Sequence, residues 1–183
     1  EVNALASTVI STTTTVYVRY ELASGCFVTG TINVVVDLPA EVEAGNAQSI
    51  CAGATATLTG SSIGGTATSG TWTITTSPAG GDGALTGAGP DNSPADATFT
   101  ATVPGAYTLT LTTNDPTGAC GALTDVVVVT VTAQPTLAIV QPTAVCSPTA
   151  VDVTTVALGE LPTGGTATYY GTMADATNEV NAL

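Results

Sequence analysis

The sequence predicts an all-β protein, and three observations lead to this prediction. Hydrophobic residues make up 44% of the 183 positions, whereas charged residues make up 8% and aromatic residues 4%. β-branched Thr and Val recur throughout the chain, and both favour extended strands. Short runs alternate apolar and polar residues, as in 107–112, and Gly- or Pro-containing turns separate them. Because apolar residues nowhere recur with a helical period, we expect no helix.

Predicted strands follow one another at short intervals through the middle of the chain. Turn residues separate them, among them Pro78, the glycine-rich 80–83 and the pair Pro104-Gly105. The strands are expected at 41–43, 54–59, 70–76, near 85, 97–102, 106–113 and 123–132. About seven short strands with this spacing favour a β-sandwich.

Alternation within these strands predicts which side chains form the core. Successive residues of a strand point to opposite faces, so every second apolar residue belongs to one face. The predicted inner face consists of Leu58, Trp72, Ile74, Phe99, Tyr107, Leu109, Leu111, Val127, Val129 and Val131. Threonine supplies much of the opposite face without adding charge.

Two levels of repetition organise the chain. The pentapeptide Glu-Val-Asn-Ala-Leu stands at 1–5 and again at 179–183, which indicates a tandem repeat with a period of 178 residues. Within one period, Gly-Gly-Thr-Ala-Thr occurs at 64–68 and at 164–168. Cys51 and Cys146 lie in similar contexts, and Tyr107 to Leu111 resembles the run that starts at Tyr17. We therefore expect the sequence to be an excerpt of a longer chain.

These correspondences divide one period into two related modules. Residues 40–134 form a complete module in this interpretation. Residues 135–183 form the first half of the other module, and residues 1–39 form its second half. That second module would then close only across a boundary between repeats.

The modules resemble a known group of repeats. The residues that carry the resemblance are 142–154, the strand that begins Pro104-Gly105-Ala106-Tyr107, and the turn Gly118-Ala119-Cys120 before a Val-rich strand. They resemble the immunoglobulin-like and PKD-like tandem repeats of giant Bacteroidota cell-surface adhesins, of the gliding and attachment type. The resemblance covers nearly the whole chain and implies tandem immunoglobulin-like β-sandwich modules, two per 178-residue repeat. The near-absence of cations departs from many such repeats.

The composition excludes several classes of function. The chain has one Lys or Arg against 14 Asp and Glu, with a formal net charge of −13. It offers no cationic face for nucleic acid and no run long enough to insert into a membrane. It has no His and no Lys for a general base, a nucleophile dyad or an imidazole metal site. We therefore expect no enzyme and no cofactor.

The four cysteines, Cys26, Cys51, Cys120 and Cys146, are candidates for disulfides. An even number in a chain without His fits an oxidising, extracellular setting better than a zinc site. Three alternatives are open. In the first, Cys51 pairs with Cys26 of the following repeat, and Cys146 pairs with Cys120 of the following repeat. In the others, Cys51 and Cys120 pair within one module, or the thiols stay free.

A few further residues are candidates for sites. Asp82, Asp91 and Asp96 lie in or near a glycine-rich loop and carry oxygen ligands suited to Ca²⁺, but we favour an irregular loop at the edge of the sandwich. Tyr169 and Tyr170 are adjacent, so on a strand one of them is exposed and is a candidate for partner contact. Trp72 is expected in the core, and Arg19 is expected to pair with Glu21 or with a neighbouring acid.

The resemblance and the repeats together suggest a function. We expect a structural repeat that stacks end to end in the stalk of an extracellular adhesin, transmits force and extends a distal binding tip. Its partners would be neighbouring identical repeats, with lateral self-association of the filaments as a further possibility. The resemblance implies a cell-surface protein exported by type IX secretion. The alternative is an adhesive module that itself binds glycan or protein on another cell.

Overall fold

A computed structural model describes residues 9–159, 161 and 163–183 of the chain. Strands dominate it, which confirms the predicted all-β class. The chain divides into two compact units, 1–133 and 134–183. Every buried residue of the described chain lies between Ala40 and Val131. The pentapeptide at 1–5 lies outside the described residues.

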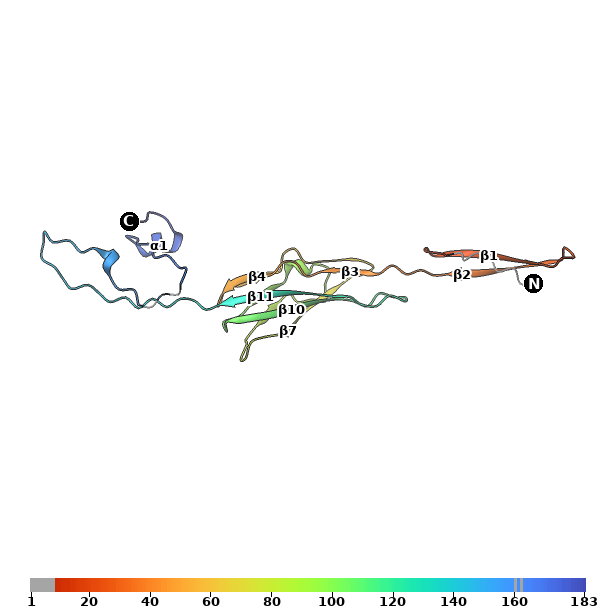
Figure 1. Cartoon of the computed structure of the whole chain (residues 1–183), viewed down its shortest axis with the longest axis horizontal. Helices are drawn as coiled ribbons and strands as arrows, with labels where there is room; N and C mark the ends of the chain where they lie inside the picture. The colour runs from red at the N-terminus through yellow and green to blue at the C-terminus, as the bar shows by residue number, and fades with distance from the viewer. Residues whose placement is uncertain (1–8, 160, 162) are drawn as a thin grey trace. The chain divides into compact units, whose positions relative to one another are not determined.

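One sheet of four strands forms the first layer of residues 40–133. It consists of β4 (Gln48–Cys51), β11 (Thr124–Thr132), β10 (Gly105–Thr113) and β7 (Gly70–Thr76), in that order (Figure 1). β10 pairs antiparallel with β11 and with β7, whereas β11 and β4 run parallel. An early strand of the module and its last strand therefore lie side by side and point the same way.

The facing layer consists of short strands. β5 (Thr55–Thr57), β9 (Thr98–Thr100) and β8 (Ala84–Thr86) form one sheet, with the 3₁₀ turn Pro94–Asp96 leading into β9. β3 (Ala40–Glu43) and β6 (Ser62–Gly65) form another. Side chains from both layers meet in one hydrophobic cluster, in which the rings of Phe99 and Tyr107 lie 5.1 Å apart. This arrangement is a β-sandwich.

The predicted inner face is confirmed. Nine of its ten members are buried, and Ile74 is half-buried against the same cluster. β4 and β6 were not predicted, because each has four residues, and β6 ends in two glycines that carry no strand signal. β4 and β6 adopt strand conformation because they form ladder hydrogen bonds with β11 and β3, respectively.

A separate hairpin precedes the sandwich. It consists of β1 (Thr14–Glu21) and β2 (Phe27–Val34), which pair antiparallel with Val16 opposite Ile32 and Tyr20 opposite Val28. No residue within the described range 9–39 is buried. The hairpin therefore has no hydrophobic core of its own, and a lone two-stranded hairpin is at best marginally stable in water.

Residues 134–183 form the second unit, and their described part also contains no buried residue. It holds a 3₁₀ turn at Val153–Thr155 and the helix α1 (Met173–Asn178). The helix contradicts the expectation of a helix-free chain. It has only six residues, too few to show a helical period, and the Thr172 side chain caps it by accepting a hydrogen bond from the Asp175 N–H.

Candidate functional site

The glycine-rich loop is tied down by the carboxylate of Asp82. The backbone N–H groups of Thr102 (2.9 Å) and Val103 (3.0 Å) donate to Asp82 Oδ1, and the Thr102 hydroxyl donates to Oδ2. The Tyr107 hydroxyl donates to Oδ1 at 3.3 Å and to the Val103 carbonyl at 2.9 Å. The hydrogen bonds from Thr102 and Val103, above all that from the Thr102 hydroxyl, lower the pKa of Asp82 from 3.8 to about 2. The side chain thus fastens the loop to the turn between β9 and β10.

The other two calcium candidates have local roles. Asp91 accepts a hydrogen bond from the Ser93 N–H at 2.9 Å, and Asp96 lies in the 3₁₀ turn that leads into β9. The described part of the chain contains no group of three or more Asp, Glu, Cys or His side chains placed to hold a metal ion. The fold therefore does not gather Asp82, Asp91 and Asp96 into a cation site.

Trp72 and Arg19 lie where the sequence predicts. Trp72 is buried in the core, and its indole N–H donates to the Pro94 carbonyl at 3.0 Å. Arg19 forms an ion pair with Glu21 at 2.8 Å, and its guanidinium lies 3.5 Å above the centre of the Phe27 ring. The only cation of the sequence is therefore already engaged within the hairpin.

Tyr169 and Tyr170 do not lie on a strand, and both are half-buried, so the structure does not expose one and bury the other. Tyr170 forms an isolated antiparallel bridge with Ala182, and the Leu183 N–H donates to the Tyr169 carbonyl at 2.9 Å. Their role in partner contact stays a prediction.

The four cysteines are described, and no disulfide joins any of them. Cys51 is the last residue of β4 and lies opposite Thr132, the last residue of β11. Cys120 lies four positions before Thr124, the first residue of β11. Nine strand residues separate these ends by roughly 27 Å, but a disulfide needs Cα atoms within about 7 Å. A bond between Cys51 and Cys120 within one module is therefore excluded by the geometry of the sandwich.

Cys120 lies beside the segment that enters the sandwich. Its thiol donates to the Asp37 carbonyl at 3.6 Å, and the Ala119 N–H donates to the Asp37 carboxylate at 2.7 Å. Gly118 has a positive φ of 126°, and a Cβ at this position would collide with the Asp37 carboxylate. The loop that carries Cys120 therefore packs closely against Asp37.

The hairpin presents an apolar face that none of the residues described by the structure covers. Cross-strand partners point to the same side of a hairpin, so the register places one set of side chains together. This apolar face consists of Val16, Val18, Tyr20, Val28, Ile32 and Val34. Tyr20 is 65% exposed and Ile32 52% exposed, and Val16 and Val34 are half-buried. The sequence comparison aligned this strand with β10 through Tyr17, which lies on the opposite face, and it therefore did not identify the apolar face. The alternation of Val16, Val18 and Tyr20 is nevertheless visible in the sequence.

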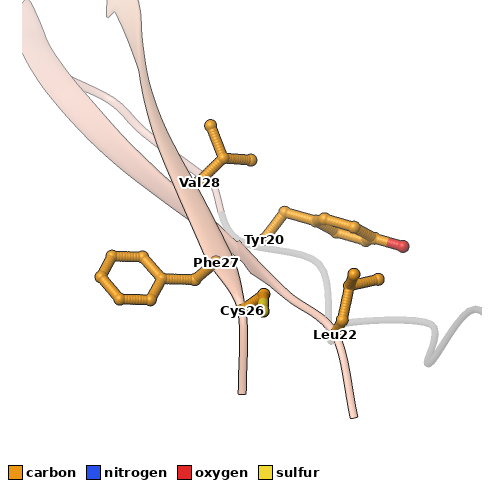
Figure 2. A pocket seen from close by; sticks show the side chains of 5 residues that line it. All are labelled: Tyr20, Leu22, Cys26, Phe27 and Val28. Atoms are coloured by element: carbon orange, nitrogen blue, oxygen red, sulfur yellow. The ribbon is translucent and has the colours of Figure 1, made fainter. Parts of the chain in front are cut away.

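The opposite face of the hairpin is more polar. It carries Tyr17, Arg19, Glu21 and Phe27 among threonines. Near the turn, an open hollow of about 300 Å³ is lined by Tyr20, Leu22, Cys26, Phe27 and Val28. Figure 2 shows that Phe27 points away from Tyr20 and Leu22, so the hollow is shallow and does not enclose a ligand.

The second unit exposes apolar side chains in the same way. Among its described residues, the large exposed apolar side chains are Leu137, Ile139, Val140, Val145, Val151, Val153, Leu161, Met173, Val180 and Leu183. Backbone contacts between its distant parts are few, such as the Val140 N–H donating to the Ala157 carbonyl at 3.1 Å. These exposed side chains are available for contact with another apolar surface.

Among the described residues, no helix combines the length and the hydrophobicity needed to span a bilayer. A scan against protein-family models and a search of curated proteins both give no match to this chain.

Proposed function

We propose that this chain is a force-bearing structural repeat in the stalk of an extracellular adhesin. The parallel pairing of β4 and β11 is the observation that supports this function best. Ser49 lies opposite Thr130, and Cys51 lies opposite Thr132. The chain enters β4 at Gln48 and leaves β11 at Thr132, so tension along the chain pulls the two strands past each other.

This direction of pull determines the mechanical resistance. When two parallel strands are sheared along their length, all the hydrogen bonds between them carry the load together and must break together. When the same strands are pulled apart from one end, the bonds break one after another. The sandwich is therefore built to resist tension applied through its own neighbours in a chain of modules.

The composition and the repeats agree with a stalk on the cell surface. Threonine-rich outer faces with few charges offer few side chains for ligand binding, and a tandem period of 178 residues would place identical modules next to each other. An immunoglobulin-like assignment of the sandwich, export by type IX secretion and disulfides between neighbouring modules belong to the same proposal. The four cysteines, three of them exposed and one half-buried, are available for such bonds.

Force spectroscopy of single molecules tests the function. One variant is pulled through the two ends of 40–133. A second variant is pulled through Cys51 and a cysteine introduced by Thr132→Cys, after the other three cysteines have been changed to Ser. We expect a severalfold higher unfolding force for the first attachment, because it shears the β4–β11 pair and the second unzips it.

Unfolding of residues 40–133 should release on the order of 300 Å of chain in either geometry, which confirms that the same module is measured. Equal or lower resistance to pulling through the ends would contradict a force-bearing role.

A further inference from the structure

We propose that the apolar face of the hairpin binds residues 134–183 of a second copy of this chain, and that the two segments form a shared β-sandwich. This inference deepens the proposed stalk function and rests on it. Its starting point is that the described residues of 9–39 and of 134–183 include none that is buried, although both segments carry many apolar side chains. Each segment therefore has an apolar surface but no core.

The hairpin matches the central hairpin of the complete sandwich. In the sandwich, Leu109 lies opposite Val127 on the buried face of β10 and β11. In the hairpin, Val16 lies opposite Ile32 on the apolar face. A shift of 95 residues relates Ile32 to Val127, and the same shift relates Val34 to Val129. The apolar face of β1 and β2 thus corresponds to the inner face of β10 and β11.

The rest of the sandwich shows what covers such a face. β10 and β11 pair at their outer edges with β7 and β4, and the layer of β5, β9 and β8 packs against them. Of these strands, β4, β5, β7 and β8 lie within residues 48–86, and sequence features of this stretch recur in 134–183. Cys51 recurs as Cys146 after a shift of 95 residues, and the glycine pair at 64–65 recurs at 164–165. The segment that corresponds to most of the missing cover is therefore 134–183.

A second copy supplies this cover more simply than the same copy does. The hairpin connects to the sandwich through Asp37, which contacts the loop just before β11. Residues 134–183 leave from the other end of β11, after Thr132. The two connections are thus separated by nine strand residues, or roughly 27 Å. They favour contact between the hairpin of one copy and the C-terminal segment of another.

Both segments offer several apolar side chains for a contact. A typical stable interface buries roughly 800 Å² on each partner. The apolar face brings six side chains and the two unpaired edges of β1 and β2. The second unit brings the ten exposed apolar side chains from Leu137 to Leu183 named above. Strand pairing along both edges would add backbone hydrogen bonds to this apolar contact.

The contact also predicts which cysteines meet. In the sandwich, Cys51 lies opposite Thr132. A shift of 95 residues relates Cys51 to Cys146, and it also relates Asp37 to Thr132. Cys146 of the second copy should therefore lie beside Asp37. The Cys120 thiol already contacts the Asp37 carbonyl at 3.6 Å. The shared sandwich would therefore place Cys146 of one copy next to Cys120 of the other.

Sedimentation velocity of the full 183-residue chain under reducing conditions tests the contact. We expect assembly that grows with concentration between about 1 and about 100 μM. Ile32→Asp on the apolar face and Val145→Asp in the second unit should each give monomers, because each places a charge in the contact. Thr31→Asp and Ala144→Asp add the same charge at adjacent positions and should assemble like the unchanged chain.

Mixing the two monomeric variants gives the sharpest result. The Ile32→Asp chain keeps an intact segment 134–183, and the Val145→Asp chain keeps an intact hairpin. We expect an equimolar mixture to form dimers and nothing larger, because only one contact can form per pair. Trp72 fluorescence verifies that the sandwich is folded in every variant.

Oxidised glutathione supplies a second measurement on the assembled chain. The two thiols lose two protons and two electrons, and oxidised glutathione is reduced to two molecules of glutathione as the disulfide forms. We expect peptide mapping to find Cys146 of one chain joined to Cys120 of another. A different pairing would overturn the proposed alignment of the two segments.

Three results would overturn the contact itself. They are an unchanged chain that stays monomeric throughout this range, a mixture that stays monomeric, and a Val145→Asp chain that still dimerises through hairpin-to-hairpin contact. None of them alters the shear resistance of residues 40–133, so the failure of this inference can be distinguished from the failure of the stalk function.

Discussion

Asp82 shows how a single side chain organises a glycine-rich loop. Its carboxylate accepts hydrogen bonds from the backbone of Thr102 and Val103 and from two hydroxyl groups, and all these donors lie at least 20 positions further along the chain. The sequence suggested a calcium ligand, since an aspartate among glycines is typical of both roles. The two roles can be distinguished only in the folded chain, where residues 102–107 come back to Asp82 and donate hydrogen bonds to its carboxylate.

The lowered pKa of Asp82 makes a prediction about stability and pH. Because its pKa is about 2 in the folded chain and near 3.8 in an unfolded one, its ionised form stabilises the fold above about pH 4. This contribution is lost as the pH falls from about 4 towards 2. We expect Asp82→Asn to be less stable than the unchanged chain at pH 7, and the difference to shrink towards pH 2.

Urea unfolding followed by Trp72 fluorescence at several pH values measures this difference. Asp96→Asn removes the same charge from an exposed position and serves as the control. A difference between Asp82→Asn and the unchanged chain that stays constant from pH 7 to pH 2 would show that the carboxylate charge does not stabilise the loop.

At the scale of elements, the two hairpins have related patterns and opposite environments. Leu109 in β10 is completely buried, whereas its counterpart Val16 in β1 is only half-buried, on a face that no described residue covers. The alternating pattern identifies an apolar face in each hairpin. It does not say whether another layer covers that face, because this depends on residues far away in the chain.

This contrast predicts different costs for similar truncations. Leu109→Ala should lower the free energy of unfolding of the sandwich by about 2–5 kcal/mol, since it leaves a cavity in a packed core. Val16→Ala should change that stability by less than about 0.5 kcal/mol, since it lies outside the core. Chemical denaturation of both variants at low concentration provides the measurement. A large loss of stability for Val16→Ala would show that the hairpin packs within its own chain.

The sequence predicted the long strands well and the short elements poorly. β7, β10 and β11 alternate over seven to nine residues, which is enough to reveal a period of two. The four-residue strands β4 and β6 depend on their partners, and the six-residue α1 depends on its Thr172 cap. Of the candidate sites, the core role of Trp72 and the ion pair of Arg19 followed from local pattern. The apolar face of the hairpin could be identified only once the register between β1 and β2 was known.

For the whole molecule, net charge is expected to govern how closely neighbouring chains approach each other. The formal net charge of −13 includes only one cation, and Arg19 is already paired with Glu21. Chains with this net charge repel each other at distances up to the Debye length, which is about 10 Å at 0.1 M salt and about 3 Å at 1 M. Lateral association is therefore expected to depend on salt.

Static light scattering can measure this repulsion. The Ile32→Asp variant is the suitable sample, because end-to-end assembly should be blocked in it. We expect a positive second virial coefficient at low salt that falls towards zero near 1 M NaCl. The conservative change Arg19→Lys keeps the net charge and should follow the same curve. A coefficient that does not respond to salt would show that charge does not control lateral approach.

The opposite attachment points of the two flanking segments have a further consequence. If residues 134–183 of one copy bind the hairpin of the next, the contact joins two different surfaces of the same chain, and it builds a polar fibre with two unlike ends where successive copies do not close into a ring. A fragment that lacks residues 1–39 would bind at one of these ends only, and it would act there as a chain terminator. A fragment that lacks 134–183 would do the same at the other end, so the length of the fibre could be limited from either direction.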